Sequence, residues 1–419
     1  MRKKFLSFAF IAAMVFAGVS FTSCSDDDDD DVFYDTESTI TVENVVSMKE
    51  FVQSGTFNAV AVGESVSIQF HAGKGQRLMF ATMYGYSNDI FFAPENPGLE
   101  LFNSDGVAIT GDVSSQIHMW DNGTRINEQP GSEVTHPGAV QTGNVTKVET
   151  QDAQGNVYRP ASELVKLNLS YDSTTSQFTL TITNNSNTAN GVNQTPLSAG
   201  AWAVSNVLDG DLVKSEPFFK EGEKSSAQLT ALAESGDNAS LRTMIGEMTG
   251  TITTLSPVVV VVYTGDVNPI YELDKKDGNI GLKELAQKGD ASKLKTSLEG
   301  MTNVRHVYVL GSNSIKPGEK VSGQFKAWEN DKIAYATMFG YANDWFYANS
   351  EAIAASVIGD LTSKTVLLDD GTGINQYPGA GNHQGLFGGT PQAEDNVISK
   401  VGTTYPVPSV ANVIKVSVQ

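Results

Sequence analysis

A stretch of 31 residues that occurs twice constrains the fold of this chain more than any other feature of its sequence. GESVSIQFHAGKGQRLMFATMYGYSNDIFFA at 63–93 aligns without a gap to GEKVSGQFKAWENDKIAYATMFGYANDWFYA at 318–348, and 16 of the 31 positions are identical. A second pair of motifs follows, DNGTRINEQPG at 121–131 and DDGTGINQYPG at 369–379. Self-similarity of this extent indicates two structural units of the same kind.

Alternating apolar and polar residues predict strands within each unit. FTLTITN at 178–184 and VSIQF at 66–70 both show the period of two that is typical of a half-buried strand. A strand followed by a short amphipathic helix is predicted at 197–245, and again at 255–298. Thr, Ser, Asn, Gly and Val are plentiful along the chain, and this composition also favours β-structure.

These patterns predict a mainly β protein made of two antiparallel β-sandwich modules, at 38–250 and 251–419, each with one short helical excursion. The length of 419 residues fits this division, because a domain usually takes about 150 residues. A β-barrel is the alternative architecture.

The N-terminus has the features of a secretory signal peptide. Residues 1–23 combine a basic start, an apolar stretch and small residues, in a pattern too short for a permanent membrane span. The next residue, Cys24, is the only cysteine, and FTSC resembles the lipobox of bacterial lipoproteins, in which the cysteine is acylated. The alternative is a free cysteine near a conventional cleavage site.

Residues 24–37 contain the run SDDDDDD, which predicts a solvated, self-repelling tether. The run also resembles the acidic export signal of Bacteroidetes surface lipoproteins. Together with Cys24, this predicts a protein that is lipid-anchored in the outer membrane and exposed at the cell surface.

Charge and motif content exclude several functional classes. The formal net charge of −20 repels phosphate backbones, so nucleic acid is not expected as a partner, and cations are better candidates. The sequence lacks the G-x-S-x-G, H-E-x-x-H, Walker and G-x-G-x-x-G motifs. Its five histidines show no metal-ligand spacing. We therefore expect a protein that is not an enzyme.

The repeated motifs place one pair of aspartates in each module, Asp89 with Asp121 and Asp344 with Asp369. If the members of a pair converge, two like charges lie close together, which is unfavourable without a cation or a raised pKa. Oxygen-rich loops of a β-sandwich suit Ca²⁺, which takes about six to eight oxygen ligands. The alternative is that these aspartates cap turns by accepting backbone N–H bonds.

Aromatic residues accompany the first aspartate of each pair, Phe91 and Phe92 in one copy and Trp345, Phe346 and Tyr347 in the other. They have the composition of a recognition platform. Adjacent residues on a strand usually point to opposite faces, one to the core and one outward, and large aromatics dominate buried area. We therefore predict that these aromatics are mainly core residues.

The order of the motifs, ATM…NDxF(F/Y)A, then D-x-GT-x-x-N-x-x-PG, then LA(E/Q)xGD, resembles the spondin domain in its bacterial form, over nearly everything after Thr39. The resemblance implies an antiparallel β-sandwich related to C2 domains, with calcium bound at loops on one edge and a role in adhesion. It also implies that Asp89, Asp121, Asp344 and Asp369 are the calcium ligands.

The spondin family usually has a further acid four residues after the second aspartate, where this chain has Arg125 and Gly373. Glu128 in the first module and Asp370 in the second are the candidate replacements. The second module is expected to be the better calcium site, because Asp370 adds an oxygen there and no arginine intrudes.

Three functions remain open on the sequence. The first is a non-enzymatic surface lipoprotein that binds an extracellular protein or glycan. The second is a structural spacer on the cell surface. The third is an extracellular carbohydrate-active hydrolase that uses paired carboxylates. Duplication disfavours the hydrolase, because both copies keep the aspartates and neither adds a distinct general acid or nucleophile.

Overall fold

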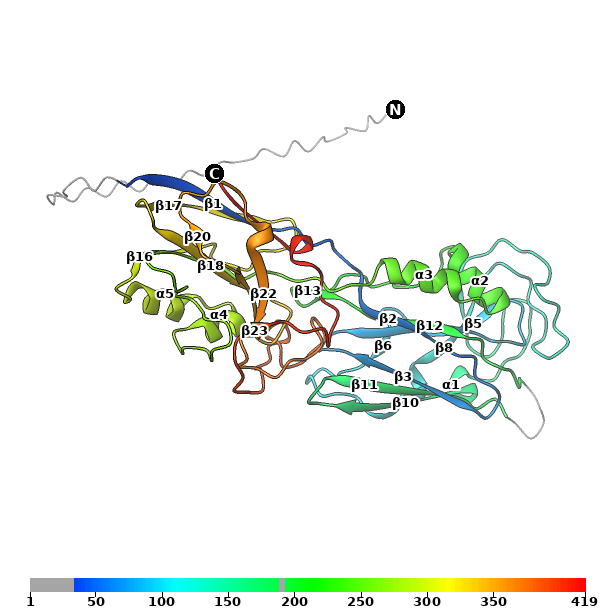
Figure 1. Cartoon of the computed structure of the whole chain (residues 1–419). Coiled ribbons are helices and arrows are strands. Elements are labelled where there is room, and N and C mark those ends of the chain that lie inside the picture. Colours follow the sequence, from blue (N-terminus) through cyan, green and yellow to red (C-terminus); the bar gives the residue numbers. More distant parts are fainter. Residues whose placement is uncertain (1–33, 188–192) are drawn as a thin grey trace, which may run out of the picture. The chain divides into compact units, whose positions relative to one another are not determined.

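A computed structural model describes residues 34–187 and 193–419 and shows mainly antiparallel sheets (Figure 1). The predicted mainly β class is therefore confirmed. The predicted signal peptide, Cys24 and the aspartate run lie outside the described residues. Within the described ranges, no helix is both long and apolar enough to cross a membrane. Contacts hold residues 35–419 in one unit, so the division at residue 250 stays a prediction.

Module 1, which we define as residues 51–250, contains two sheets. The first has, in spatial order, β2 (Phe51–Phe57), β12 (Gly200–Ser205), β4 (Arg77–Met83), β5 (Ile90–Pro94), β8 (Ile117–Asp121) and β9 (Thr146–Val148), with β6 (Leu99–Glu100) beside β4. The second has β3 (Ser65–His71), β11 (Gln177–Asn184), β10 (Val165–Asp172) and β7 (Gly111–Asp112). A small hairpin, β13 (Val207–Leu208) and β14 (Asp211–Leu212), follows β12.

Module 2 repeats this arrangement with residues 36–46 and 251–419. Its first sheet has β16 (Val304–Leu310), β15 (Val258–Tyr263), β18 (Lys332–Met338), β19 (Trp345–Asn349), β22 (Thr365–Asp369) and β23 (Ser399–Lys400), with β20 (Ile353–Ala354) beside β18. Its second sheet has β17 (Lys320–Ala327), β1 (Thr36–Asn44), β24 (Ile414–Val418) and β21 (Gly359–Asp360).

Strand β1 is the main departure from the predicted module boundaries. In module 1, β11 lies between β3 and β10 and follows β10 along the chain. In module 2, the same place is taken by β1, which pairs antiparallel with β17 on one side and with β24 on the other. The boundary predicted at residue 38 is therefore corrected, because β1 belongs to the sheet of the C-terminal repeat.

One asparagine shows that β1 is the counterpart of β11. The side-chain amide of Asn44 donates to the backbone oxygens of Thr253 and Ile315, each at 2.9 Å. Asn184, at the end of β11, donates to the two aligned carbonyls of module 1 at 3.0 and 2.8 Å. Each asparagine thus satisfies two buried carbonyls at the same point of its sandwich.

Helices cover the outer face of the larger sheet in each module. Module 1 uses α2 (Ala227–Ser235) and α3 (Ala239–Glu247), and module 2 uses α4 (Leu282–Lys288) and α5 (Ser292–Glu299). A one-turn helix, α1 (Ala161–Leu164), leads into β10. Each module therefore has two hydrophobic cores, one between its two sheets and one between its larger sheet and its helices.

The aromatics beside the repeated aspartates are buried, as predicted. All five residues of β5 and all five of β19 are buried, because helices cover the face that a two-layer sandwich would expose. Phe91 meets Phe219 edge-on in the core beneath the helices, and Phe346 meets Tyr271 in the same way. The expectation that one of two adjacent aromatics points outward is wrong, and these rings form no surface platform.

Candidate metal centre in the duplicated loops

Strand pairing brings the two aspartates of each motif pair together. Asp89 immediately precedes β5, and the next residue, Ile90, pairs with Asp121 at the end of β8. In module 2, Asp344 immediately precedes β19, and Trp345 pairs with Asp369 at the end of β22. The aspartates lie side by side because neighbouring antiparallel strands bring their ends to the same edge of the sheet.

In module 1, Asp89 uses only one of its carboxylate oxygens in hydrogen bonds among the described residues. Its Oδ2 accepts the backbone N–H groups of Thr124 at 2.7 Å and Arg125 at 2.8 Å, and the Thr124 hydroxyl at 3.0 Å. Its Oδ1 is buried and has no hydrogen-bond partner within the described ranges. Asp121 accepts from the backbone of Gly123 and from the amide of Asn127.

Module 2 repeats this pattern. Asp344 Oδ2 accepts from the backbone N–H groups of Thr372 at 2.7 Å and Gly373 at 2.8 Å, and from the Thr372 hydroxyl at 3.1 Å. Asp344 Oδ1 is again buried, with no partner in the part of the chain that the structure describes. One oxygen of each first aspartate therefore caps the Gly-Thr turn. The other is left available, as a metal ligand would be.

Burial and like charge act together on these carboxyls. Burial, assisted by the neighbouring charge of Asp369, raises the pKa of Asp344 to about 7. Burial, followed by the charge of Asp89, raises the pKa of Asp121 to about 7. The pKa of Asp89 is raised by burial as well. Two ionised carboxylates at such a site repel each other, and a bound cation would relieve that repulsion.

A third acid, Glu394, joins the pair in module 2, and sequence reasoning missed it. Ligand oxygens of Asp344, Asp369 and Glu394 all lie within 4.8 Å of one another, and among the described residues this is the single group of three potential ligands at that spacing. Burial, followed by the charge of Asp369, raises the pKa of Glu394. Three carboxylates at one point form the hard, all-oxygen donor set that Ca²⁺ prefers.

The structure does not bring the two candidate replacement acids into this group. Glu128 is exposed, and its carboxylate accepts the backbone N–H of Thr135 at 3.4 Å. Asp370 is fully buried, and one of its oxygens accepts the hydroxyl of Thr372 at 3.0 Å. Burial, followed by the charge of Asp277, raises the pKa of Asp370 to about 8. Neither acid shares the spacing of Asp344, Asp369 and Glu394.

The guanidinium of Arg125 is paired with a helix residue in module 1, and its charge also acts on Asp89. The guanidinium pairs with Glu234 of α2 at 2.7 Å, and Glu234 also accepts the hydroxyl of Thr124 at 2.8 Å. In module 2, Gly373 stands at the arginine position and Gln287 of α4 at the glutamate position. The ion pair is therefore present in module 1, whereas module 2 has an uncharged residue at each of the two positions.

We predict that substitutions of Glu234 and Arg125 have coupled effects on the free energy of unfolding. Glu234→Gln leaves the guanidinium of Arg125 largely buried without its counter-charge, and we expect a loss of about 2 kcal/mol, between the cost for exposed and for fully buried pairs. Adding Arg125→Gly, which recreates the residues of module 2, should recover more than half of that loss. Urea unfolding of the single and double variants measures both values.

The control for this cycle is Glu50→Gln, which breaks an ion pair of Glu50 with Lys214 whose side chains are each 33% exposed. That change should cost less than about 1 kcal/mol, as pairs near the surface do. A Glu234→Gln variant that is no less stable than Glu50→Gln contradicts the role given to Glu234.

No protein-family model matches the chain, and no curated protein matches it.

Proposed function

We propose that this chain is a non-enzymatic surface lipoprotein, anchored through Cys24, whose sandwich modules bind an extracellular ligand with loops stiffened by calcium. The observation that carries the proposal is the duplicated loop edge. Both modules keep an aspartate pair in which one buried oxygen has no partner among the described residues. Selection for folding alone favours satisfied polar groups, so keeping this feature in two copies points to a bound cation.

We place the stronger calcium site of this proposal in module 2, on Asp344, Asp369 and Glu394. Three carboxylates give a larger negative charge than the two of module 1, where Arg125 replaces a neutral glycine. Gln141 stands at the position of Glu394, because each donates its backbone N–H to the threonine of its Gly-Thr turn. Affinity for Ca²⁺ rises with the number of charged ligands. Calcium would hold β19, β22 and the loop of Glu394 together at one edge of the sheet.

Calcium titration of the purified, metal-stripped chain tests this site. We expect binding in the range of extracellular calcium modules, about 10⁻⁴ to 10⁻³ M, together with a higher melting temperature in calcium than in chelator. Asp344→Asn and Glu394→Gln should each abolish the heat of this binding event, because each removes one charged ligand of three.

Asp89→Asn is the matched control, since Asp89 accepts the same turn hydrogen bonds as Asp344 in the other module. It should leave the module 2 binding heat in place. If wild-type protein binds no calcium at millimolar concentration, or if Glu394→Gln binds as wild type does, the calcium site is rejected.

Retention on a glycoprotein surface tests the binding function itself. We expect the calcium-loaded protein to be retained on immobilised mucin and released in part by chelator, because loops freed from the ion lose their preorganised shape. Bovine serum albumin on the same sensor is the control. The binding function is contradicted if the protein is retained on neither untreated mucin nor mucin stripped of its glycans.

A further inference from the structure

Each module contains a hollow at the same place. It lies where the C-terminal end of α2 in module 1, or of α4 in module 2, meets the larger sheet. The hollow of module 1 measures about 750 Å³ and that of module 2 about 560 Å³, both in the range of small-molecule sites. Five residues that line the second hollow have an identical residue at the aligned position of the first. In module 2 they are Leu255, Ser256, Gly289, Met338 and Gly340.

The floor of the two hollows is built in the same way. The hydroxyl of Ser256 accepts the backbone N–H of Met338 at 2.8 Å, and that of Ser198 accepts the N–H of Met83 at 2.9 Å. The wall beside each serine is the glycine that ends the helix, in the left-handed conformation at φ 71° in Gly289. A Cβ on this glycine would lie 3.1 Å from the Cβ of Ser256, so a larger residue would narrow the hollow.

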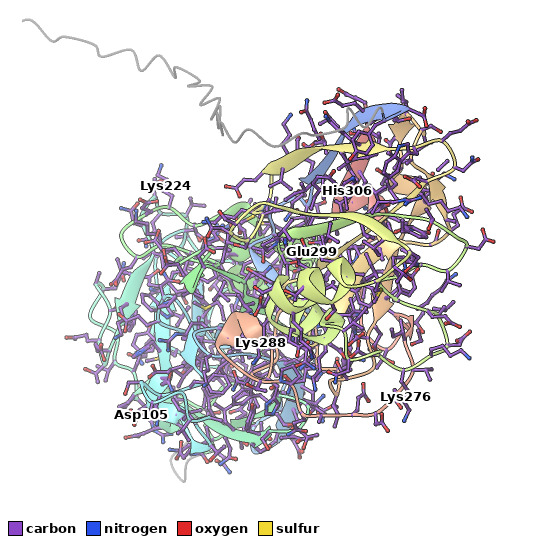
Figure 2. All side chains as sticks on the ribbon, turned by 90° about the vertical axis from the view of Figure 1, so that its left-hand side faces the viewer. Asp105, Lys224, Lys276, Lys288, Glu299 and His306 are labelled. Carbon is purple, nitrogen blue, oxygen red and sulfur yellow. The ribbon has the colours of Figure 1, made fainter. Side chains whose placement is uncertain are left out.

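The rim of the module 2 hollow is neutral and rich in hydroxyl groups. Ser312, Asn313, Ser314 and Thr390 line it and are exposed, above an apolar floor that includes Met338. The two charged residues that line this hollow, Asp209 and Lys288, are of opposite sign (Lys288 is labelled in Figure 2). Such a lining suits a ligand with many hydroxyl groups, no net charge and a small apolar face.

Other ligand classes fit this lining less well. Among the described residues, no arginine lines either hollow, so the charge clusters that recognise phosphate or acidic peptides are absent there. The aromatic residue of the module 2 lining, Tyr341, is 1% exposed and donates its hydroxyl to the backbone of Val207. It therefore offers no face to a proline-rich peptide, which docks on exposed aromatic rings.

We propose that the two hollows are paired saccharide sites, each taking one or two neutral sugar units through their hydroxyl groups and one C–H face. This inference rests on the binding function proposed above and names the ligand class and its site. The rims differ. Module 1 has His136, Pro137 and Glu234, whereas module 2 has Gln287, Lys288 and the hydroxyl-bearing residues named above. The two sites thus share a floor and differ in fine specificity, and binding both to one glycan surface raises avidity.

Each hollow also borders the carboxylate loop of its module. Gln287 lines the hollow and donates to the hydroxyl of Thr372 at 3.0 Å, and the same hydroxyl contacts Asp344. In module 1, Glu234 takes the equivalent place and accepts the hydroxyl of Thr124. A cation held by the aspartates would therefore fix one wall of the saccharide site.

Saturation-transfer NMR with four neutral methyl glycosides (gluco, galacto, manno and N-acetylglucosamine) tests the proposal on the calcium-loaded full chain. We expect signal transfer to at least one glycoside at millimolar concentration. Ala59→Trp and Ser314→Trp change aligned, exposed residues that line the two hollows. Each should reduce the signal by filling one hollow, and the double variant should abolish it.

Ala153→Trp is the control, because Ala153 is exposed and lines neither hollow. The inference is overturned if none of the four glycosides receives signal, or if signal persists in the double variant. Its failure is distinguishable from failure of the binding function. Retention on mucin that survives removal of the glycans leaves a protein-binding function in place and rejects the saccharide sites.

Discussion

Deleting residues 36–46 should unfold module 2 and leave module 1 folded, although the deletion lies at the opposite end of the sequence from the sheet that it damages. The reason is that β1 is an interior strand of that sheet. It pairs with β17 over Thr36 to Glu43 and with β24 over Ile40 to Asn44. Its removal leaves two rows of backbone N–H and C=O groups without partners.

The deletion also empties the core between the sheets of module 2. Ile40 and Val42 are 1% and 0% exposed and pack in that core. Each such truncation costs about 1–5 kcal/mol, and the lost strand pairing adds to it. The sum matches or exceeds the roughly 5–15 kcal/mol that stabilises a typical domain.

Hydrogen exchange resolves the two modules in one experiment. Amides of β17 and β24 should lose protection in the deletion variant, whereas those of β3 and β11 should keep it. A synthetic peptide of residues 34–46, added in excess, should restore protection by re-entering the vacant position. Val42→Ala and its counterpart Ile182→Ala form the matched pair, each expected to weaken its own module. Unchanged protection of β17 and β24 in the deletion variant would refute the role of β1.

The predicted boundaries assigned most of β1 to module 1, although β1 belongs to a sheet of module 2. The repeat correctly predicted a mainly β chain with antiparallel strands, because aligned motifs with a period of two specify equivalent half-buried strands. It also led to the assumption that each module is continuous in sequence. TESTITVEN at 36–44 resembles QFTLTITN at 177–184, including the final asparagine, and that likeness is the signal that β1 replaces β11.

The sequence predicted the four aspartates of the candidate sites, which lie in duplicated motifs. It did not predict Glu394, which lies outside them. Asp89, Asp121, Asp344 and Asp369 lie in repeated motifs at strand ends, so their convergence follows from antiparallel pairing. Glu394 lies in a long loop, where Gly373 bridges to the neighbouring Ala393. A loop crossing of that kind has no period or spacing that a sequence pattern reveals.

The second large effect is expected in β19, the strand that directly follows the repeated Asn-Asp of module 2. Phe346→Ala should lower the free energy of unfolding by about 3–5 kcal/mol, as truncation of a fully buried phenylalanine does. Phe346 is 0% exposed and packs beneath the helices with Leu285, Leu294 and the edge of the Tyr271 ring. The residues around Phe346 are held in place by the sheet on one side and the helices on the other. They therefore cannot move in to fill the cavity that the alanine leaves.

Urea unfolding measures this loss, and the slope of the transition reports whether the native state stays compact. Ile358→Ala is the control within module 2, because Ile358 is 72% exposed and its truncation should change the stability by less than about 0.5 kcal/mol. A loss below about 1 kcal/mol for Phe346→Ala would contradict its place in the core beneath the helices. Phe91→Ala, the same change in module 1, should give a loss of similar size, since Phe91 is also 0% exposed beneath the helices of its own module.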